Sequence, residues 1–472
     1  MLYSAEWKDI MKKKLLLTAL AGLNFICLGA EEQKANDNGA KEQVVSRQHK
    51  VVTLPEAINK ALQNGVALQI AEAQESGASL SEKAILLQTL LPSLSLGMRL
   101  DNNKNMFSSG DDEKLSATRV LGDPNVSLEF GYTLFDGFKS SAALGKAAAE
   151  RDLAEAGVKN AHRTLVSEVV QAYLNILTAQ KSIEAAEKNI EQTQNLLKRA
   201  QTEYEIGQST KTNVLAAEAK VAEAKATLAK QKVALVQGNQ LYKRVVGEAP
   251  VRLQPPALNI MLPSSVEEAV QLSNVNNYEV IKAVADHDKS TLTFIQAGGA
   301  FLPKVSASLK MTRKTPLNDL FKSTDEAKFS KTIGLTLEMN LFNGGADILN
   351  TWGAAKQKTA ARLAVENARQ KIEEKIAKTW EEIRAAKATL EQTRLGEKAY
   401  ELMFEAMKNE ERLGKSSFLD LLKAQNEYFN SVIARVEAEQ AVHIKMASLL
   451  ELTGTLTVDA LGVTLQKEEM KE

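Results

Sequence analysis

The sequence has little that could build a disulfide scaffold, a metal centre or a nucleic-acid surface. Its 472 residues include 1 cysteine, which excludes a disulfide-stapled fold. The 4 histidines lie far apart and lack the close pairing that is typical of a zinc site. The 59 Lys and Arg residues are balanced by 59 Asp and Glu residues, so the chain lacks the basic surplus of a nucleic-acid-binding protein. We therefore expect no cofactor, no metal and no nucleic-acid partner.

Proline and aromatic residues are also scarce. The chain has 9 prolines and 5% aromatic residues, a composition that favours long helices over several compact cores. It shows no Gly-x-Ser-x-Gly motif and no obvious catalytic pair, so we expect that the protein is not an enzyme. Gly414-Lys415-Ser416 resembles a phosphate loop only superficially, because Asn409 stands where the earlier glycine is needed.

The first residues have the pattern of a secretory signal peptide. Lys12–Lys14 precede an apolar run from Leu15 to Leu28, which is followed by small residues. The run is short for a membrane span, and an uncleaved anchor is the alternative. We therefore expect residues 1–30, with Cys27 among them, to be removed on export. Residues 31–50 are polar and without periodicity, which predicts a flexible N-terminal segment.

The rest of the chain is a tandem duplication. Thr53–Ile58 reappears as Ser265–Val270, and Leu134–Gly137 reappears as Leu341–Gly344. Further landmarks recur in the same order, namely Leu91-Pro92 as Leu302-Pro303, Ile206-Gly207 as Leu413-Gly414, and Gly247 as Gly454. The duplication predicts two structural repeats and a tail. The repeats are expected at 51–250 and 251–455, and the C-terminal tail at 456–472.

Each repeat contains two stretches in which apolar and polar residues alternate. Alternation with a period of two predicts β-strands with one apolar and one polar face. These strands are predicted at 94–101, 126–135, 305–312 and 333–342. Their length suits strands that cross a membrane at a tilt, whereas a soluble β-sandwich is the alternative. In a channel the polar face would line an aqueous lumen, and its charged members are Arg99, Glu129, Lys310 and Glu338.

Long helices follow the strands in both repeats. Residues 140–205 and 347–412 contain no proline and predict helices of roughly 100 Å. Apolar residues recur at intervals of seven, which predicts a coiled-coil seam. In the first repeat they are Val169, Ile176, Ile183, Ile190, Leu197 and Tyr204, and in the second Ile376, Ile383, Leu390 and Phe404. Shorter helices are predicted at 55–90, 210–246, 267–300 and 417–452. Gly207 and Gly414 mark the turns at which the chain reverses.

Four strands cannot close a barrel, and open sheet edges are not tolerated in lipid. If the strands span a membrane, several chains must share one barrel, and three chains would supply twelve strands. Since each repeat would cross twice, the helices and both termini stay on one side, which is the periplasm for an exported protein of a two-membrane cell. Aromatic residues such as Phe135, Phe138 and Phe342 would then belong to a membrane girdle or simply pack where strand meets helix.

Taken together, these features resemble the TolC-type outer-membrane efflux proteins, or outer membrane factors. The resemblance covers about residues 51–455 and rests on the duplication, the two Leu-Phe elements and the glycine turns. Each turn is followed by a similar motif, Asn213-Val214-Leu215 in the first repeat and Asp420-Leu421-Leu422 in the second. The absence of a cysteine anchor after the signal peptide fits the non-lipidated branch of the family.

The resemblance implies a fold and a set of partners. The expected fold is mainly α with membrane β, in a homotrimer whose 12-stranded outer-membrane β-barrel continues into a periplasmic α-helical barrel. The expected function is that of a passive exit duct in a tripartite efflux or type I secretion system. Its partners would be a periplasmic adaptor protein, a proton-driven or ATP-driven inner-membrane transporter, and outer-membrane lipid. The sequence does not identify the exported substrate, and drugs, metal ions, polysaccharides and proteins are the alternatives.

The resemblance also implies a gate at the periplasmic tip. The matching positions are Asp420, Asn213, Arg412, Ser416 and Lys423. Three Asp420 carboxylates around one axis would select cations, although Lys423 stands where the family often has a second acidic residue. The alternative for Asp420 is a helix residue that caps the turn.

The exposed turns at the same end are the expected adaptor contacts. Their residues are Gly207, Gln208, Ser209, Gly414, Lys415 and Ser417. Glycine and serine also favour turns without any partner, and both interpretations are compatible. A structural coiled-coil envelope protein without a channel is the alternative for the whole chain, and an envelope hydrolase would explain none of these features.

Overall fold

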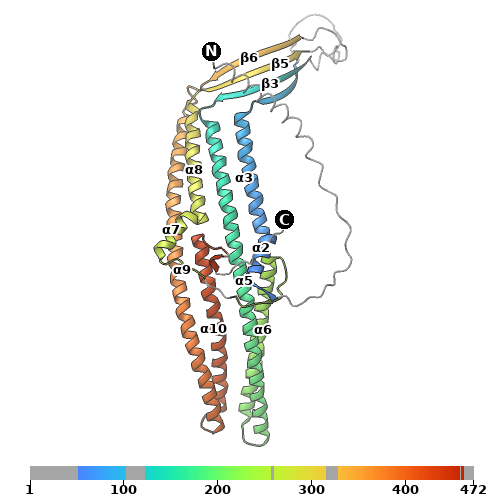
Figure 1. The fold of residues 1–472 in the computed structure, drawn as a ribbon, viewed down its shortest axis with the longest axis vertical. Coiled ribbons are helices and arrows are strands. Elements are labelled where there is room, and N and C mark those ends of the chain that lie inside the picture. Colours follow the sequence, from blue (N-terminus) through green and yellow to red (C-terminus); the bar gives the residue numbers. More distant parts are fainter. Residues whose placement is uncertain (1–50, 102–122, 257–259, 315–327, 458, 462–472) are drawn as a thin grey trace, which may run out of the picture. The chain divides into compact units, whose positions relative to one another are not determined.

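The structure is a computed structural model that describes residues 51–101, 123–256, 260–314, 328–457 and 459–461. The described residues are mainly helical, with one four-stranded sheet (Figure 1). The predicted signal peptide at 1–30 and the segment 31–50 lie outside the described residues, as does most of the tail.

In the first repeat, the helix predicted at 55–90 is two helices. They are α2 (Leu54–Asn64) and α3 (Val66–Leu90), and the chain is extended at Gly65 between them. A Cβ atom at Gly65 would lie 2.6 Å from the carbonyl oxygen of Ala61 and 2.7 Å from a methyl group of Leu165. The continuous helix was therefore a wrong prediction, because the break lets the chain pack closely against Leu165.

The second repeat is broken at the equivalent point. Its helices are α7 (Val266–Asn276) and α8 (Tyr278–Gly298), where one helix was predicted at 267–300. Asn277 separates them: its Oδ1 accepts a hydrogen bond from the Glu279 N–H at 2.9 Å, and its Nδ2 donates to the Leu452 carbonyl at 2.8 Å. Asn277 thus caps α8 and ties it to the last helix of the chain.

Each repeat ends in a helical hairpin. In the first, α5 (Lys139–Glu205, 67 residues) packs along α6 (Lys211–Val246). In the second, α9 (Ala346–Arg412) packs along α10 (Phe418–Thr453). Contacts of α5 with α8 and with α10 join the two repeats (Figure 1).

The seam predicted along α5 changes along its length. Val169 and Ile176 are fully buried, whereas Tyr204 is 47% exposed. In the later turns the buried positions are smaller residues, namely Ser182, Ala186, Asn189, Thr193 and Ala200. A straight helix drifts by about 20° per heptad against a strict seven-residue repeat. The apolar column therefore rotates away from the neighbouring helices of the same chain, and Ile183, Ile190 and Leu197 are half-buried.

The sheet is antiparallel, in the order β2-β3-β5-β6. Its strands are β2 (Ser93–Asp101), β3 (Asp123–Phe135), β5 (Lys304–Lys314) and β6 (Lys328–Glu338). Strands β2 and β6 are the two edges of the sheet, and neither has a second neighbour within the described chain. Among the described residues, the sheet is therefore open on both sides.

The last strand lies earlier than its prediction at 333–342. It begins at Lys328 and ends at Glu338, where Glu338 is paired with Lys304. Pro303 precedes Lys304 and has no N–H to donate, so the ladder has no further partner for the residues after Glu338. The segment 339–342 accordingly leaves the sheet.

A buried core lies where the two repeats meet. Short strands β1 (Val51–Val52) and β4 (Arg252–Leu253) pair in parallel beside it. The Tyr173 hydroxyl accepts the Gln254 N–H at 3.0 Å and lies 2.9 Å from the Val52 carbonyl. Burial raises the pKa of Tyr173 to about 12, so this phenol stays neutral. Its hydroxyl forms hydrogen bonds with the chain at both short strands.

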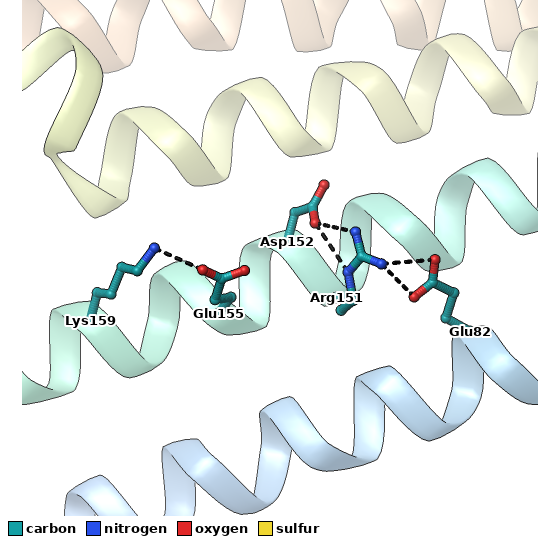
Figure 2. A network of polar contacts seen from close by, with 5 residues as sticks. All are labelled: Glu82, Arg151, Asp152, Glu155 and Lys159. Carbon is teal, nitrogen blue, oxygen red and sulfur yellow. Dashed lines mark hydrogen bonds and ion pairs between the residues drawn. The ribbon is translucent and has the colours of Figure 1, made fainter.

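Helices α3 and α5 are joined by Arg151 (Figure 2). Its Nη1 lies 2.8 Å from Glu82 Oε2 on α3, and its Nη2 lies 2.7 Å from Asp152 Oδ1 on α5. The hydrogen bond to Asp152 is the largest cause of the raised pKa of Arg151. Since all three side chains are at least partly exposed, we expect these contacts to fix the alignment of the two helices more than to stabilise the protein.

Candidate functional site

Two turns form the candidate docking site, one at the end of each hairpin. Gly207 and Gly414 adopt left-handed conformations, with φ of 75° and 70°. Nothing lies within 4 Å of a Cβ atom added at either position. Glycine is therefore favoured there because of the left-handed backbone conformation and not because a side chain would clash. The Gln208 N–H donates to the Glu203 carbonyl at 2.8 Å, and the Lys415 N–H donates to the Glu410 carbonyl at 2.9 Å. Gln208 and Lys415 are both exposed, so the two turns present equivalent surfaces.

Asp420 forms the cap of α10 together with Ser417. The Ser417 Oγ accepts the Asp420 N–H at 3.1 Å and donates to Asp420 Oδ2 at 2.6 Å. The capping interpretation therefore describes the geometry of this chain. It does not conflict with a gate, because Asp420 is exposed and keeps a second carboxylate oxygen.

The other predicted gate residues lie near the same two turns. Asn213 donates to Ser209 Oγ at 3.1 Å on the first, and Ser416 donates to Met407 Sδ at 3.3 Å on the second. Arg412 and Lys423 are exposed. Within the described part of the chain, no ion pair joins Lys423 to Asp420. The structure brings the five residues to the ends of the hairpins but does not place them around one axis within a single chain.

Sequence reasoning missed the residues that hold the two hairpins together near these turns. Arg199 on α5 forms an ion pair with Glu411 on α9, and its Nε lies 3.1 Å from Glu203 Oε1. The guanidinium also lies over the ring of Phe418, 5.7 Å from its centroid. Phe418, the first residue of α10, is 7% exposed and packs with Ala200 and Ala217 of the first hairpin. Glu411 interrupts the heptads of α9, which is the one local signal that could have pointed to this contact.

The polar face of the sheet carries all four predicted lumen residues. The register pairs Glu129 with Lys310 across β3 and β5, and their charged groups lie 3.7 Å apart. Alternation along β2 and β6 puts Arg99 and Glu338 on the same face as this pair. The opposite face of the sheet is apolar and exposed in the single chain, at Leu94, Leu96, Met98, Ile333, Leu335 and Leu337.

Two features of other protein classes are absent from the described residues. No group of three or more His, Cys, Asp or Glu side chains in these ranges is placed to hold a metal ion. Among the helices described, none has both the length and the apolar character needed to cross a membrane.

Comparison with known proteins agrees with the duplicated architecture. The family described as "Outer membrane efflux protein" matches residues 57–246 and 269–455, one block in each repeat. The outer membrane efflux protein BepC of Brucella suis biovar 1 (strain 1330) is 24% identical over 360 residues, which are 76% of this chain and 78% of BepC.

Solved outer-membrane proteins have the same fold. The outer membrane protein VceC from Vibrio cholerae superposes with a TM-score of 0.70 at 20% identity, over 85% of this chain and 96% of VceC. The open state of the MtrE outer membrane channel from Neisseria gonorrhoeae gives a TM-score of 0.71 at 18% identity, over 86% of this chain and 91% of MtrE.

The family match covers most of both repeats, and it confirms the resemblance that the duplicated landmarks, the alternating strands and the glycine turns predicted. It also agrees with a sheet that has one polar and one apolar face and is continued by long helical hairpins. The chain belongs to the outer membrane efflux protein family and serves as an exit duct of the outer membrane.

Proposed function

We propose that three copies of this chain close one β-barrel and form a passive duct for an inner-membrane pump. The observation that carries this proposal is the open sheet. Its two edges, β2 and β6, lack partners within the described chain, and one of its faces is apolar and exposed. Lipid tolerates neither unpaired strand edges nor partial closure, so the edges of neighbouring copies must meet. Twelve strands enclose a lumen wide enough for water.

The direct test is conductance of the purified protein in a planar lipid bilayer. The proposal predicts stable single-channel steps that depend on the folded protein and vanish after heat denaturation. A structural coiled-coil protein without a channel would insert no conducting unit. Purified protein that gives no steps, although it is folded and present in the outer membrane, would overturn the duct.

We further propose that the two turns dock a periplasmic adaptor. The support is their equivalence, because Gln208 and Lys415 occupy matching exposed positions after a left-handed glycine. A photo-crosslinking residue at either position should trap one and the same envelope protein in living cells. The same residue at Lys83, exposed on α3, is the matched control and should not trap that protein. Equal trapping from all three positions would refute docking at the turns.

The proposed gate consists of Asp420 together with the link between the hairpins. In a trimer, three copies of Asp420 would lie near the axis and repel one another, so bound cations are favoured there. Arg199 holds the second hairpin against the first through Glu411 and the ring of Phe418. The closed state would then depend on Arg199, and Arg199→Ala should increase the mean conductance in the bilayer. A Lys181→Ala variant, which removes a longer contact of 3.8 Å to Glu439, is the matched control.

A further inference from the structure

A buried polar cluster joins the two hairpins away from the turns. Gln425 on α10 is 2% exposed, and it inserts between Asn189 and Thr193 of α5. These two residues are 8% and 3% exposed. Because Gln425 belongs to the second repeat and its partners to the first, the cluster is an internal contact between the two halves of the chain.

Only the Nε2 group of the Gln425 amide has hydrogen-bond partners among the described residues, whereas its Oε1 atom has none. Its Nε2 donates to Thr193 Oγ1 at 2.8 Å and lies 3.0 Å from Asn189 Oδ1. Thr193 in turn donates to the Asn189 carbonyl at 2.7 Å, which completes the protein side of the cluster. The Gln425 Oε1 atom is buried, and no donor in the described residues reaches it. A buried amide oxygen without a donor is costly, so it calls for a ligand that can donate.

A small cavity lies beside this cluster, and Gln425 is one of its lining residues. Its volume is about 40 Å³, and it is bounded by α5, α6 and α10. Its lining is mainly polar, with Thr227, Asn426 and Asn430 beside the Gln425 cluster. A cavity needs about 10–15 Å³ and two to four polar partners to hold one water molecule, and this one meets both conditions. The nearby Lys220 and Glu223 are paired with each other at 2.6 Å, so neither brings an uncompensated charge.

We propose that this cavity is a hydration site, in which bound water donates to Gln425 Oε1 and completes a polar joint that fixes the register of α10 against α5. The other buried side chains of α5 in this region are small, as at Ala186 and Ala200. Small apolar side chains at heptad spacing set no unique register, whereas one buried polar group does so at a cost in stability. The joint belongs to each chain by itself and does not depend on export or on oligomeric state.

The first test is a high-resolution cryo-EM map of the purified full-length protein in detergent. We expect water density within hydrogen-bonding distance of Gln425 Oε1 and of at least one other polar atom of the lining. A dry cavity, or an amide turned so that Oε1 meets a protein donor, would overturn the hydration site. Density with the short, multiple oxygen contacts of a bound cation would overturn it as well.

The second test separates hydrogen bonding from register. Gln425→Leu alone leaves Asn189 and Thr193 buried without their partner, so the melting temperature should fall by several degrees. The triple variant Asn189→Leu, Thr193→Val and Gln425→Leu removes every member of the cluster and should recover most of that loss. Ser182→Ala, at another buried polar position of the same seam, is the matched control. It should leave the melting temperature and the distance between α5 and α10 near their wild-type values.

Register is measured by spin labels at Gln192 on α5 and Ala434 on α10, both exposed. Cys27 is the only natural cysteine and lies in the segment that is expected to be removed on export, so cysteines introduced at these two positions are labelled specifically. With labelled chains diluted by unlabelled ones, wild type should give one narrow distance and the triple variant a broad or multiple distribution. A single narrow distance in a folded triple variant would refute the register role, and an unchanged melting temperature in Gln425→Leu would refute the hydrogen-bonded joint.

Discussion

At the scale of single residues, the turn before α10 gives two neighbouring side chains separable roles. Ser417 caps the helix through the Asp420 N–H, while the Asp420 carboxylate accepts the serine hydroxyl and stays exposed. The capping contribution therefore belongs mainly to Ser417, and the charge belongs to Asp420.

This division predicts different outcomes for two variants. Asp420→Asn removes the charge but keeps a side-chain oxygen, so cation selectivity of the channel should fall while the melting temperature changes little. Ser417→Ala should cost about 1 kcal/mol of stability with unchanged selectivity. Reversal potentials in a salt gradient and thermal unfolding measure the two effects. Unchanged selectivity in Asp420→Asn would remove Asp420 from the gate.

We expect His443 on α10, which lies beside Leu174 and Lys181 of α5, to make this contact between the repeats sensitive to pH. Burial is the largest cause that lowers the pKa of His443, and Lys181 lowers it as well, whereas Glu439 raises it. A histidine held neutral in the folded state contributes stability above its unfolded pKa of about 6.5, and this contribution is lost as the pH falls below that value.

Acidification should therefore destabilise the protein, and His443→Gln should weaken that dependence. The melting temperature is compared between about pH 7.5 and about pH 5.5. We expect a smaller drop in the variant than in wild type. Burial also lowers the pKa of His162 on α5, so part of the drop should persist until both histidines are replaced. Equal drops in wild type and in the double variant would contradict this assignment.

At the scale of elements, the break between α2 and α3 can be tested with a matched pair of glycines. Gly65→Ala would bring a Cβ atom against the Ala61 carbonyl and Leu165, and should cost about 1–3 kcal/mol. Gly77 lies within α3 with nothing within 4 Å of an added Cβ atom, so Gly77→Ala should instead stabilise by about 0.5–1 kcal/mol.

Thermal unfolding measures both changes. Opposite signs at the two positions would show that close packing against α5, and not helix propensity, breaks the first helix. Equal stabilisation by both substitutions would contradict the packing account.

The elements also show what the sequence could and could not predict. Alternation located the strands, and Gly207 and Gly414 located the turns, because these signals are local and occur in both repeats. The breaks at Gly65 and Asn277 escaped notice, since neither residue alone ends a helix and the cause is a distant contact.

The contacts across the two repeats were also missed, and for a related reason. Arg199 with Glu411, and Gln425 with Asn189, are joined only after both hairpins have formed. The interruption of the α9 heptads at Glu411 marks an unusual position, but periodicity within one helix does not identify the partner on another helix. The proposed gate residues were found through a family resemblance, whereas these links follow only from the arrangement of the hairpins.

At the scale of the whole molecule, the sheet is the feature that a single chain cannot complete by itself. The sheet has two open edges and an exposed apolar face, and these need both lipid and neighbouring copies. The Arg199 link and the Gln425 joint, in contrast, lie within each chain. Assembly and internal register should therefore respond to different substitutions.

The shared trimeric barrel is best tested by the protein mass in mild detergent after membrane fractionation, from light scattering corrected for bound detergent. We predict recovery from the outer membrane and a mass of three chains, each of 51.5 kDa less any removed signal peptide. A monomer that stays soluble without detergent would contradict the shared barrel, and with it the exit duct.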